Sequence, residues 1–178
     1  MTIICALHEP GVGTWIGSDT FTNRDNRKME SGQKWVIRGS RAMSSAGLYL
    51  THNIIQENAD ELLSIDNKPH EVSKRLRELL IENGFTVKPS EGEPGWMRSH
   101  VIYATNEGVW HFGPDGTRYP VNAGQMCADG SGQDFAYGAA HACQLCGAPA
   151  QIGAALAAAI TLDNGCGGEP FIHLLKSE

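Results

Sequence analysis

The chain has 178 residues, of which 41% are hydrophobic and 19% charged, and its formal net charge is −6. This length suits one domain, residues 1–178, large enough to bury a core, and the composition excludes a disordered chain. A mildly acidic chain has no electrostatic reason to bind nucleic acid or an anionic membrane, so neither is expected as a partner.

The sequence predicts a cytoplasmic protein. No stretch approaches the roughly 18 uninterrupted apolar residues of a membrane span. The first residues lack the basic segment that begins a signal peptide. In the cytoplasm the five cysteines are expected to be reduced thiols and not a disulfide framework.

The first part of the chain predicts two pairs of strands. Short β-branched and apolar runs favour strands at residues 2–7, 14–17, 34–37 and 42–46. Turn residues at 9–13 and 38–40 separate the members of each pair. The polar stretch 18–33 between the two pairs is expected to be a loop.

Two helices are predicted next. Thr51 is a candidate N-cap for a helix whose apolar residues recur at helical spacing as far as Leu63. A second helix is expected to begin at Pro69 and to stop near Gly84. Residues 86–99 contain two prolines and two glycines, which predicts an exposed loop.

The remainder of the chain predicts strands, then two helices, then a last strand. Strands are expected at residues 100–104 and 109–112, near Met126, and at 171–175; alanine-rich helices are expected at about 133–146 and 149–162. Strands in blocks and helices in pairs indicate an α+β chain with helices on the outer faces of stacked sheets.

Several short motifs follow one another along the chain: Thr2-Ile-Ile, Gly17-Ser-Asp19, Lys34, Ala46-Gly47, a Gly-Ser-Gly segment at 130–132, and Asp163-Asn-Gly-Cys-Gly-Gly168. In this order they resemble the β-type subunits of the proteasome and the related bacterial HslV-type peptidase. The resemblance covers nearly the whole chain, and its specificity lies in the joint order of the motifs. It implies the four-layer αββα sandwich of the N-terminal-nucleophile hydrolases, without a cofactor.

The resemblance also implies a threonine-type endopeptidase that assembles into stacked rings, cleaves polypeptides and has an ATPase unfoldase as a candidate partner. Thr2 matches the nucleophile, and Asp19 and Lys34 match the ion pair beneath it. Gly47 matches the backbone N–H donor to the oxyanion. Ser131, Asp163 and Cys166 match the group that positions the amine and its water.

The chemistry requires a free N-terminal threonine. A threonine hydroxyl is a poor nucleophile without an adjacent base, and an N-terminal threonine supplies its own α-amine, with an ordinary pKa of about 7.7–8.0. A nearby lysine lowers the pKa of this amine and keeps more of it neutral.

Met1 directly precedes Thr2, so methionine must be removed before Thr2 can act. If Met1 itself is aligned with the nucleophile position, the subunit is inactive. Alignment of Thr2 needs one extra residue before Asp19, whereas alignment of Met1 needs two, which favours Thr2. The alternative function is a catalytically silent ring subunit of the same fold. Cys166 stands where the family usually has serine, and a thiol is the weaker hydrogen-bond donor.

Taken singly, the same residues have plainer interpretations. Thr2 could be an ordinary strand residue, and Asp19 with Lys34 a surface ion pair worth about 0–1 kcal/mol. The segment His141-Ala-Cys-Gln-Leu-Cys146 leaves a zinc-binding module open, with Cys127 or Cys166 as a fourth ligand. No second Cys-x-x-Cys is present, so these thiols are expected to pack in the core, and no metal site is predicted.

Overall fold

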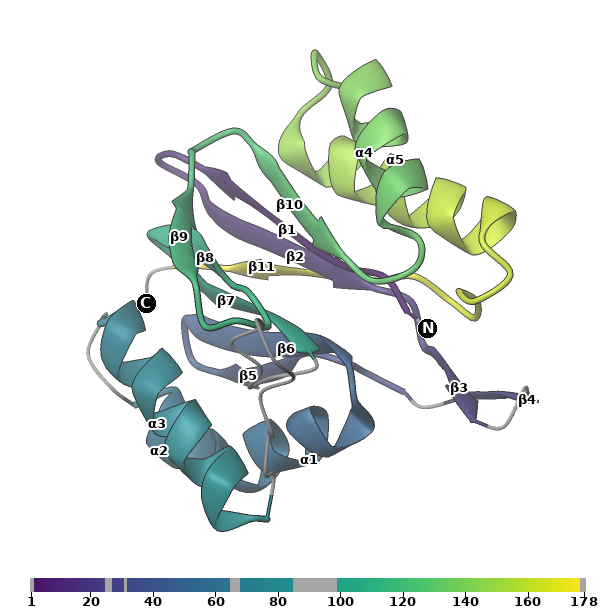
Figure 1. The fold of residues 1–178 in the computed structure, drawn as a ribbon. Helices are drawn as coiled ribbons and strands as arrows, with labels where there is room; N and C mark the ends of the chain where they lie inside the picture. Colours follow the sequence, from purple (N-terminus) through teal and green to yellow (C-terminus); the bar gives the residue numbers. More distant parts are fainter. Residues whose placement is uncertain (1, 25–26, 31, 65–67, 85–98, 177–178) are drawn as a thin grey trace.

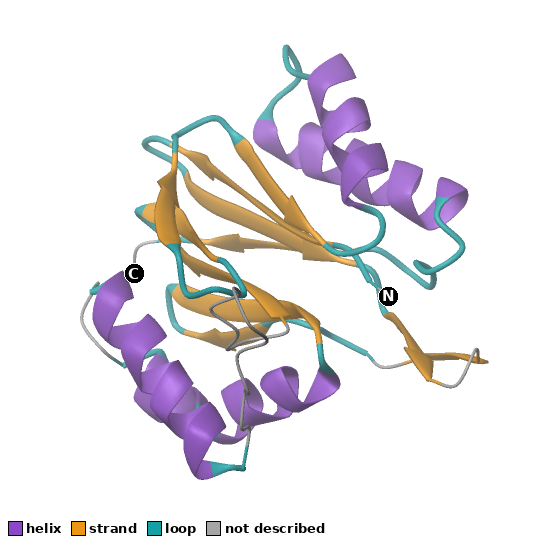
Figure 2. Ribbon diagram, viewed as in Figure 1, coloured by secondary structure: helices purple, strands orange, loops and turns teal. Residues whose placement is uncertain are grey.

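The computed structural model describes residues 2–24, 27–30, 32–64, 68–84 and 99–176. Within them, two antiparallel sheets lie face to face between two groups of helices (Figures 1 and 2).

The first sheet brings the N-terminal segment, the middle of the chain and the C-terminal segment together. Its strand order is β10 (Met126–Asp129), β1 (Ile4–Glu9), β2 (Gly13–Ser18) and β11 (Phe171–Leu175). The register places both Ser18 and Asp129 opposite Ile4. Consequently Thr2, Asp19 and Gly130, which flank these positions in sequence, fall at the same end of the sheet.

The second sheet has the strand order β5 (Val36–Arg38), β6 (Arg41–Gly47), β7 (Ser99–Thr105), β8 (Gly108–Phe112) and β9 (Arg118–Val121). Its side chains alternate between two apolar layers, as the period of a strand requires. Tyr103 packs toward the helices, whereas Ile102 and Ala104 pack toward the first sheet.

The helices form the two outer layers. The second sheet is covered by α1 (Tyr49–Glu57), α2 (Ala59–Leu62) and α3 (Pro69–Glu82), and the first sheet by α4 (Gln133–Ala142) and α5 (Ala148–Leu162) (Figure 1). Three apolar clusters fill the spaces between successive layers; fully buried examples are Leu76, Ile16 and Leu156. The predicted four-layer αββα architecture is therefore confirmed.

A glycine sets the closest approach between the first sheet and its helices. A Cβ on Gly17 of β2 would lie 2.8 Å from Cγ2 of Ile152 and 2.9 Å from Cδ1 of Leu156 on α5. The absence of a side chain at Gly17 lets α5 rest directly on the backbone of β2.

Some predicted boundaries were wrong. The stretch 18–33, predicted as a loop, contains the paired strands β3 (Phe21–Arg24) and β4 (Arg27–Glu30). This two-stranded unit projects from the body of the protein (Figure 1). A hairpin outside the core needs no alternating apolar side chains, so this segment carries no period-two signal.

Other elements also differ from the prediction. The helix predicted to reach Leu63 is divided at Asn58, whose backbone N–H and side-chain amide both donate to Ile54 O. The helix predicted over 133–146 ends at Ala142. Strand β9 was not predicted; it contains Pro120 and lies at the edge of its sheet, where proline is tolerated.

The loop predicted for residues 86–99 lies outside the described residues, apart from Ser99, which begins β7. No helix in the described part of the chain is long and apolar enough to cross a membrane.

Candidate active site

Thr2 is held at the end of β1 by the turn that follows β10. Its carbonyl oxygen accepts a hydrogen bond from the N–H of Gly132 at 3.4 Å. A Cβ on Gly130 would lie 2.1 Å from the same oxygen, and Gly130 has a φ of 109°, which side chains rarely permit. Glycine at position 130 therefore lets this turn close over the backbone of Thr2.

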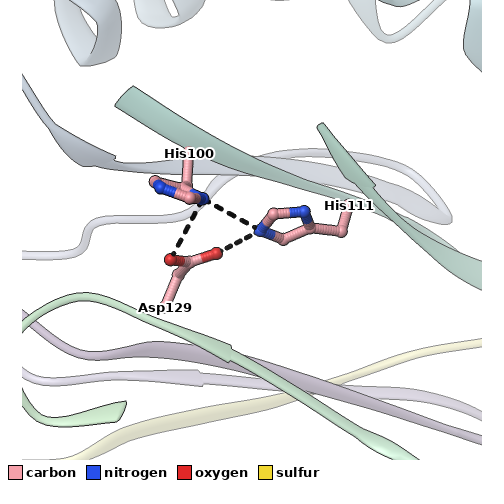
Figure 3. A group of neighbouring side chains, drawn as sticks. All are labelled: His100, His111 and Asp129. Carbon is pink, nitrogen blue, oxygen red and sulfur yellow. Dashed lines mark hydrogen bonds and ion pairs between the residues drawn. The ribbon is translucent and has the colours of Figure 1, made fainter. Parts of the chain in front are cut away.

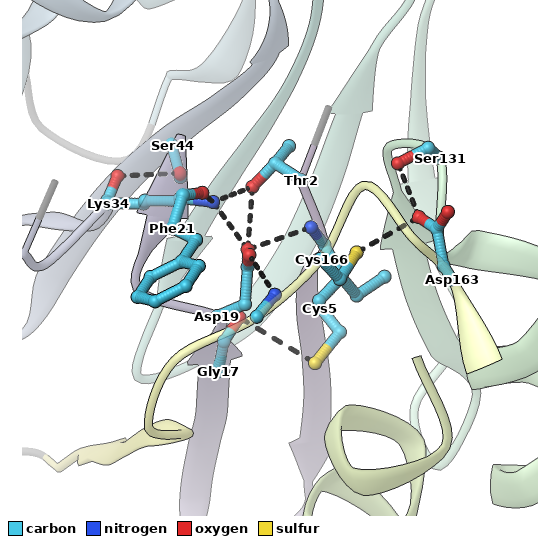
Figure 4. A network of polar contacts seen from close by, with 12 residues as sticks. Thr2, Cys5, Gly17, Asp19, Phe21, Lys34, Ser44, Ser131, Asp163 and Cys166 are labelled. Carbon is cyan, nitrogen blue, oxygen red and sulfur yellow. Dashed lines mark hydrogen bonds and ion pairs between the residues drawn. The ribbon is translucent and has the colours of Figure 1, made fainter. Parts of the chain in front are cut away.

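Asp19 follows β2 and is completely buried. Its Oδ1 accepts hydrogen bonds from Thr2 Oγ1 at 2.8 Å and from the N–H of Ile3 at 3.0 Å (Figure 4). Its Oδ2 accepts from the N–H of Gly167 at 3.1 Å. These donors stabilise a buried carboxylate and fix the rotamer of the Thr2 side chain.

Lys34 reaches the same point from the segment that precedes β5. Its Nζ donates to Thr2 Oγ1, to Asp19 Oδ1 and to the carbonyl oxygen of Phe21. Burial lowers the pKa of this ammonium below its usual value, although the Asp19 carboxylate acts in the opposite direction. The resulting arrangement presents the Thr2 hydroxyl to a buried cation and a buried anion simultaneously.

A second polar group lies beside the first. Ser131 Oγ donates to Asp163 Oδ2 at 2.5 Å, and Cys166 Sγ donates to the same oxygen at 3.1 Å (Figure 4). Burial tends to raise the pKa of Asp163, but hydrogen bonds from Ser131, Gly165 and Cys166 outweigh it and leave the pKa below its usual value. Burial, with the carboxylate of Asp163 next in effect, raises the pKa of the Cys166 thiol to about 12, so the thiol remains a proton donor.

An open pocket of about 390 Å³ lies over Thr2. Its lining residues are Thr2, Ala46, Gly47, His100, Asp129, Gly130, Ser131 and Gln133. Gly47 is the last residue of β6, pairs with Ser99 of β7 and has a φ of 134°. The seven residues singled out in the sequence thus lie in one region. Thr2, Gly47 and Ser131 line the pocket. Asp19 and Lys34 contact Thr2, and Asp163 contacts both Ser131 and Cys166.

The thiols that the competing zinc hypothesis requires do not lie together in the structure. All five cysteines are reduced thiols outside any disulfide. Cys127 packs between the two sheets and Cys166 beneath the α4–α5 layer, whereas Cys146 is exposed. In the part of the chain described, the one group of three or more His, Cys, Asp or Glu side chains with converging ligand atoms is His100, His111 and Asp129.

Two features of this region were not predicted from the sequence. The carbonyl oxygen of Phe21 lies in a segment that was predicted as a loop. His100 and Asp129 come from strands of different sheets, so only the packing of the sheets brings them into the pocket. The available signal was the alternation of β7 and β10, in which His100 and Asp129 stand two residues from the inward-facing Ile102 and Cys127.

No protein-family model and no curated protein sequence matches the chain. Several solved structures, in contrast, superpose on the chain over nearly its whole length. "Thiobacillus denitrificans BPH" superposes with a TM-score of 0.78 at 19% sequence identity, over 99% of this chain and 100% of the other. The same protein in complex with epoxomicin gives a TM-score of 0.78 at 20% identity and the same coverage.

Eukaryotic HslV from Trypanosoma brucei gives a TM-score of 0.74 at 16% identity, over 99% of this chain and 100% of that one. Identities this low establish the arrangement of the backbone and not the chemistry. Together with the four layers described above, the superpositions show that the chain has the proteasome-type, HslV-like fold of the N-terminal-nucleophile hydrolases.

Proposed function

We propose that the chain is a threonine-type endopeptidase subunit in which Thr2, after removal of Met1, attacks peptide bonds. The observation that carries the proposal is the three-way contact of Thr2 Oγ1 with the buried Asp19 carboxylate and the buried Lys34 ammonium. A threonine that served only as an ordinary residue beside a strand would need neither the carboxylate nor the ammonium group.

In the proposed catalytic cycle, the α-amine of Thr2 is the base. The neutral amine takes the proton from Oγ1 as the oxygen attacks the substrate carbonyl, and the acyl group passes to Thr2 as an ester. The protonated amine then donates to the leaving nitrogen, and a water molecule, activated by the same amine, hydrolyses the ester. Lys34 lowers the pKa of the amine by its charge, and Asp19 holds Lys34 in place.

Two further groups complete the proposed site. Gly47, at the rim of the pocket, would donate its N–H to the oxyanion that forms on the substrate carbonyl, a contact whose loss costs about 2.7–4 kcal/mol. The Ser131–Asp163–Cys166 group would position the amine and the water, with Asp163 as the acceptor.

Assembly into rings is supported by the exposed apolar surface of the α4–α5 layer. Helix α5 has no charged residue in its 15 residues. Exposed large apolar side chains on this layer are Phe135, Tyr137, Leu145 and Leu162. Apolar surface of this kind marks an interface, because a helix that is apolar on all sides is ordinarily buried.

The deciding experiment measures the intact mass of the purified protein before and after treatment with epoxomicin. An epoxyketone closes a ring only with the hydroxyl and α-amine of one N-terminal threonine. We expect loss of Met1 and one adduct per chain. Thr2→Ala should give no adduct, and the matched variant Thr161→Ala, at an exposed position of α5, should keep it.

The second candidate function is a catalytically silent ring subunit of the same fold. It is favoured by one observation, the methionine directly before Thr2 in the sequence. Retained Met1 together with an unmodified mass after epoxomicin would contradict the peptidase and support the silent subunit.

A further inference from the structure

Three neighbouring side chains, two of which line the Thr2 pocket, have no part in the proposed reaction. His100 lies on β7, His111 on β8 and Asp129 on β10 (Figure 3). Each stands two residues along its strand from an apolar residue that packs between the sheets, namely Ile102, Val109 and Cys127. The group therefore occupies the edge of the layer between the two sheets, where apolar side chains are otherwise the rule.

The burial of this group is costly unless its polar atoms converge on partners. His111 and Asp129 are only 6% and 5% exposed. His111 Nε2 contacts Asp129 Oδ2 directly, and His111 Nδ1 has no hydrogen-bond partner among the residues described. One nitrogen of each imidazole ring and the carboxylate thus point toward one another, in a site where His111 and Asp129 are buried and His100 is half-exposed.

Two of the separations between these side chains match those around a tetrahedral ion. The third pair, His111 Nε2 and Asp129 Oδ2, is in direct hydrogen-bond contact, so an ion would take Asp129 Oδ1 as its carboxylate ligand. His100 Nδ1 lies 3.3 Å from His111 Nε2 and 3.5 Å from Asp129 Oδ1. Ligand atoms bonded to zinc at about 2.0–2.1 Å in tetrahedral geometry are about 3.3–3.4 Å apart. One ligand atom from each side chain can be chosen so that all lie within 4.8 Å of one another.

We propose that His100, His111 and Asp129 form a binding site for a divalent transition-metal ion of the zinc type, beside the pocket that contains Thr2. Two imidazole nitrogens and one carboxylate oxygen suit such ions and not Mg²⁺ or Ca²⁺, which prefer oxygen ligands alone. This site replaces the sequence-based expectation that the chain has no metal site, and it is distinct from the Cys143–Cys146 hypothesis.

The position of the site leaves one coordination position open. His100 and Asp129 line the pocket, and the His100 side chain is 44% exposed, which gives an ion a path from solvent. Zinc ions held by three protein ligands typically bind a water or substrate molecule in the open fourth position. The fourth position would face the space above Thr2.

The test uses the purified full chain, freed of metal with a chelator and then titrated with Zn²⁺ by calorimetry. We expect one ion per chain. His100→Ala removes a half-exposed ligand and should weaken binding more than about 10-fold, since loss of even an outer-shell partner typically costs 10–100-fold. His70→Ala, a change at an exposed histidine of α3, should leave the affinity unchanged.

A spectroscopic measurement separates this site from the thiols. Co²⁺ in place of Zn²⁺ should give the strong visible bands of a tetrahedral ion without a thiolate charge-transfer band. The double variant Cys143→Ser/Cys146→Ser should keep these bands, and Asp129→Asn should weaken them. Circular dichroism establishes that each variant is folded before its affinity is compared.

The proposal is overturned if the wild-type chain binds no stoichiometric Zn²⁺, or if binding survives His100→Ala and disappears in the cysteine double variant. Neither readout depends on peptidase activity, so the metal site stands or falls separately from the proposed function.

Discussion

At the scale of single residues, Asp19 and Lys34 illustrate how a buried ion pair links stability to chemistry. Asp19 is fully buried and the Lys34 side chain is 9% exposed. Such a pair contributes little when intact, because desolvation offsets the attraction, but removal of one partner leaves an uncompensated charge in the interior. The pair is therefore expected to constrain substitution even in an inactive subunit.

Replacement of Lys34 by methionine should lower the free energy of unfolding by about 3–5 kcal/mol, because it strands the Asp19 carboxylate. Urea denaturation at pH 7 measures the change. Lys68→Met is the matched control, because Lys68 forms an exposed pair with Glu71 at 3.6 Å and should alter stability by less than about 0.5 kcal/mol. Equal effects of the two substitutions would mean that the Lys34 pair is not buried in solution.

Because its buried thiols stay protonated, the folded chain should lose stability at alkaline pH. Burial raises the pKa of Cys5 well above its usual value, so the folded state keeps a proton that the unfolded chain loses above about pH 8.5. Because the pKa is raised on folding, the stabilisation is fully present below about pH 8.5 and declines as the pH rises toward the folded-state pKa.

Between pH 8 and 10 the free energy of unfolding of the wild-type chain should therefore fall more than that of Cys5→Ala. The difference should reach about 2 kcal/mol at most, since each pH unit above the unfolded pKa contributes about 1.4 kcal/mol. Urea titrations of both proteins at the two pH values measure it. Parallel pH profiles for the two proteins would argue against a buried, protonated Cys5.

At the scale of elements, glycines decide how closely the helices of the α4–α5 layer pack. Gly17 has no room for a Cβ beneath α5, whereas a Cβ on Gly138 of α4 would meet no atom within 4 Å. The same substitution should therefore have opposite effects at the two positions.

Gly17→Ala should destabilise the chain by about 1–3 kcal/mol through overpacking against Ile152 and Leu156. Gly138→Ala should stabilise it by about 0.5–1 kcal/mol, because alanine costs less conformational entropy in a helix than glycine. Thermal unfolding of both variants tests the pair. A stabilised Gly17→Ala protein would contradict the close packing of α5 on β2.

At the scale of the whole molecule, the two helical layers differ in what they leave exposed. Helix α3 presents charged residues outward, and Arg75 pairs there with Glu61 and Glu82. The α4–α5 layer exposes Leu145 at 97% and Leu162 at 60%, and α5 carries no charged residue. Apolar side chains such as Ile81 are exposed on the other layer too, but α3 also carries Glu, Lys and Arg. This difference in charge is the basis for the proposed interface on the α4–α5 layer.

The double variant Leu145→Glu/Leu162→Glu should shift the protein from assemblies toward the 19.2 kDa monomer, since it places charge in the proposed interface. Light scattering after size-exclusion chromatography gives the mass. Ile81→Glu, at a 57% exposed position of α3, is the control and should leave the assembly intact. A wild-type protein that is monomeric at micromolar concentration would exclude this mode of assembly.

Local patterns in the sequence predict the layered α+β architecture, because alternation in the strands and helical spacing in the helices are preserved by burial. The order of short motifs also points to Thr2, Asp19 and Lys34. That their side chains meet is visible in the folded protein alone, because Lys34 lies 32 residues from Thr2 and the contact depends on how the first sheet packs on the second.

The polar β3–β4 hairpin and the His100–His111–Asp129 group show why the rest escaped prediction. The hairpin lies outside the core and so carries no apolar pattern. The group draws two strands from one sheet and one from the other, and each of its residues taken alone is an ordinary polar residue in a strand. Convergence of such residues is a property of sheet packing, which no local pattern in the chain encodes.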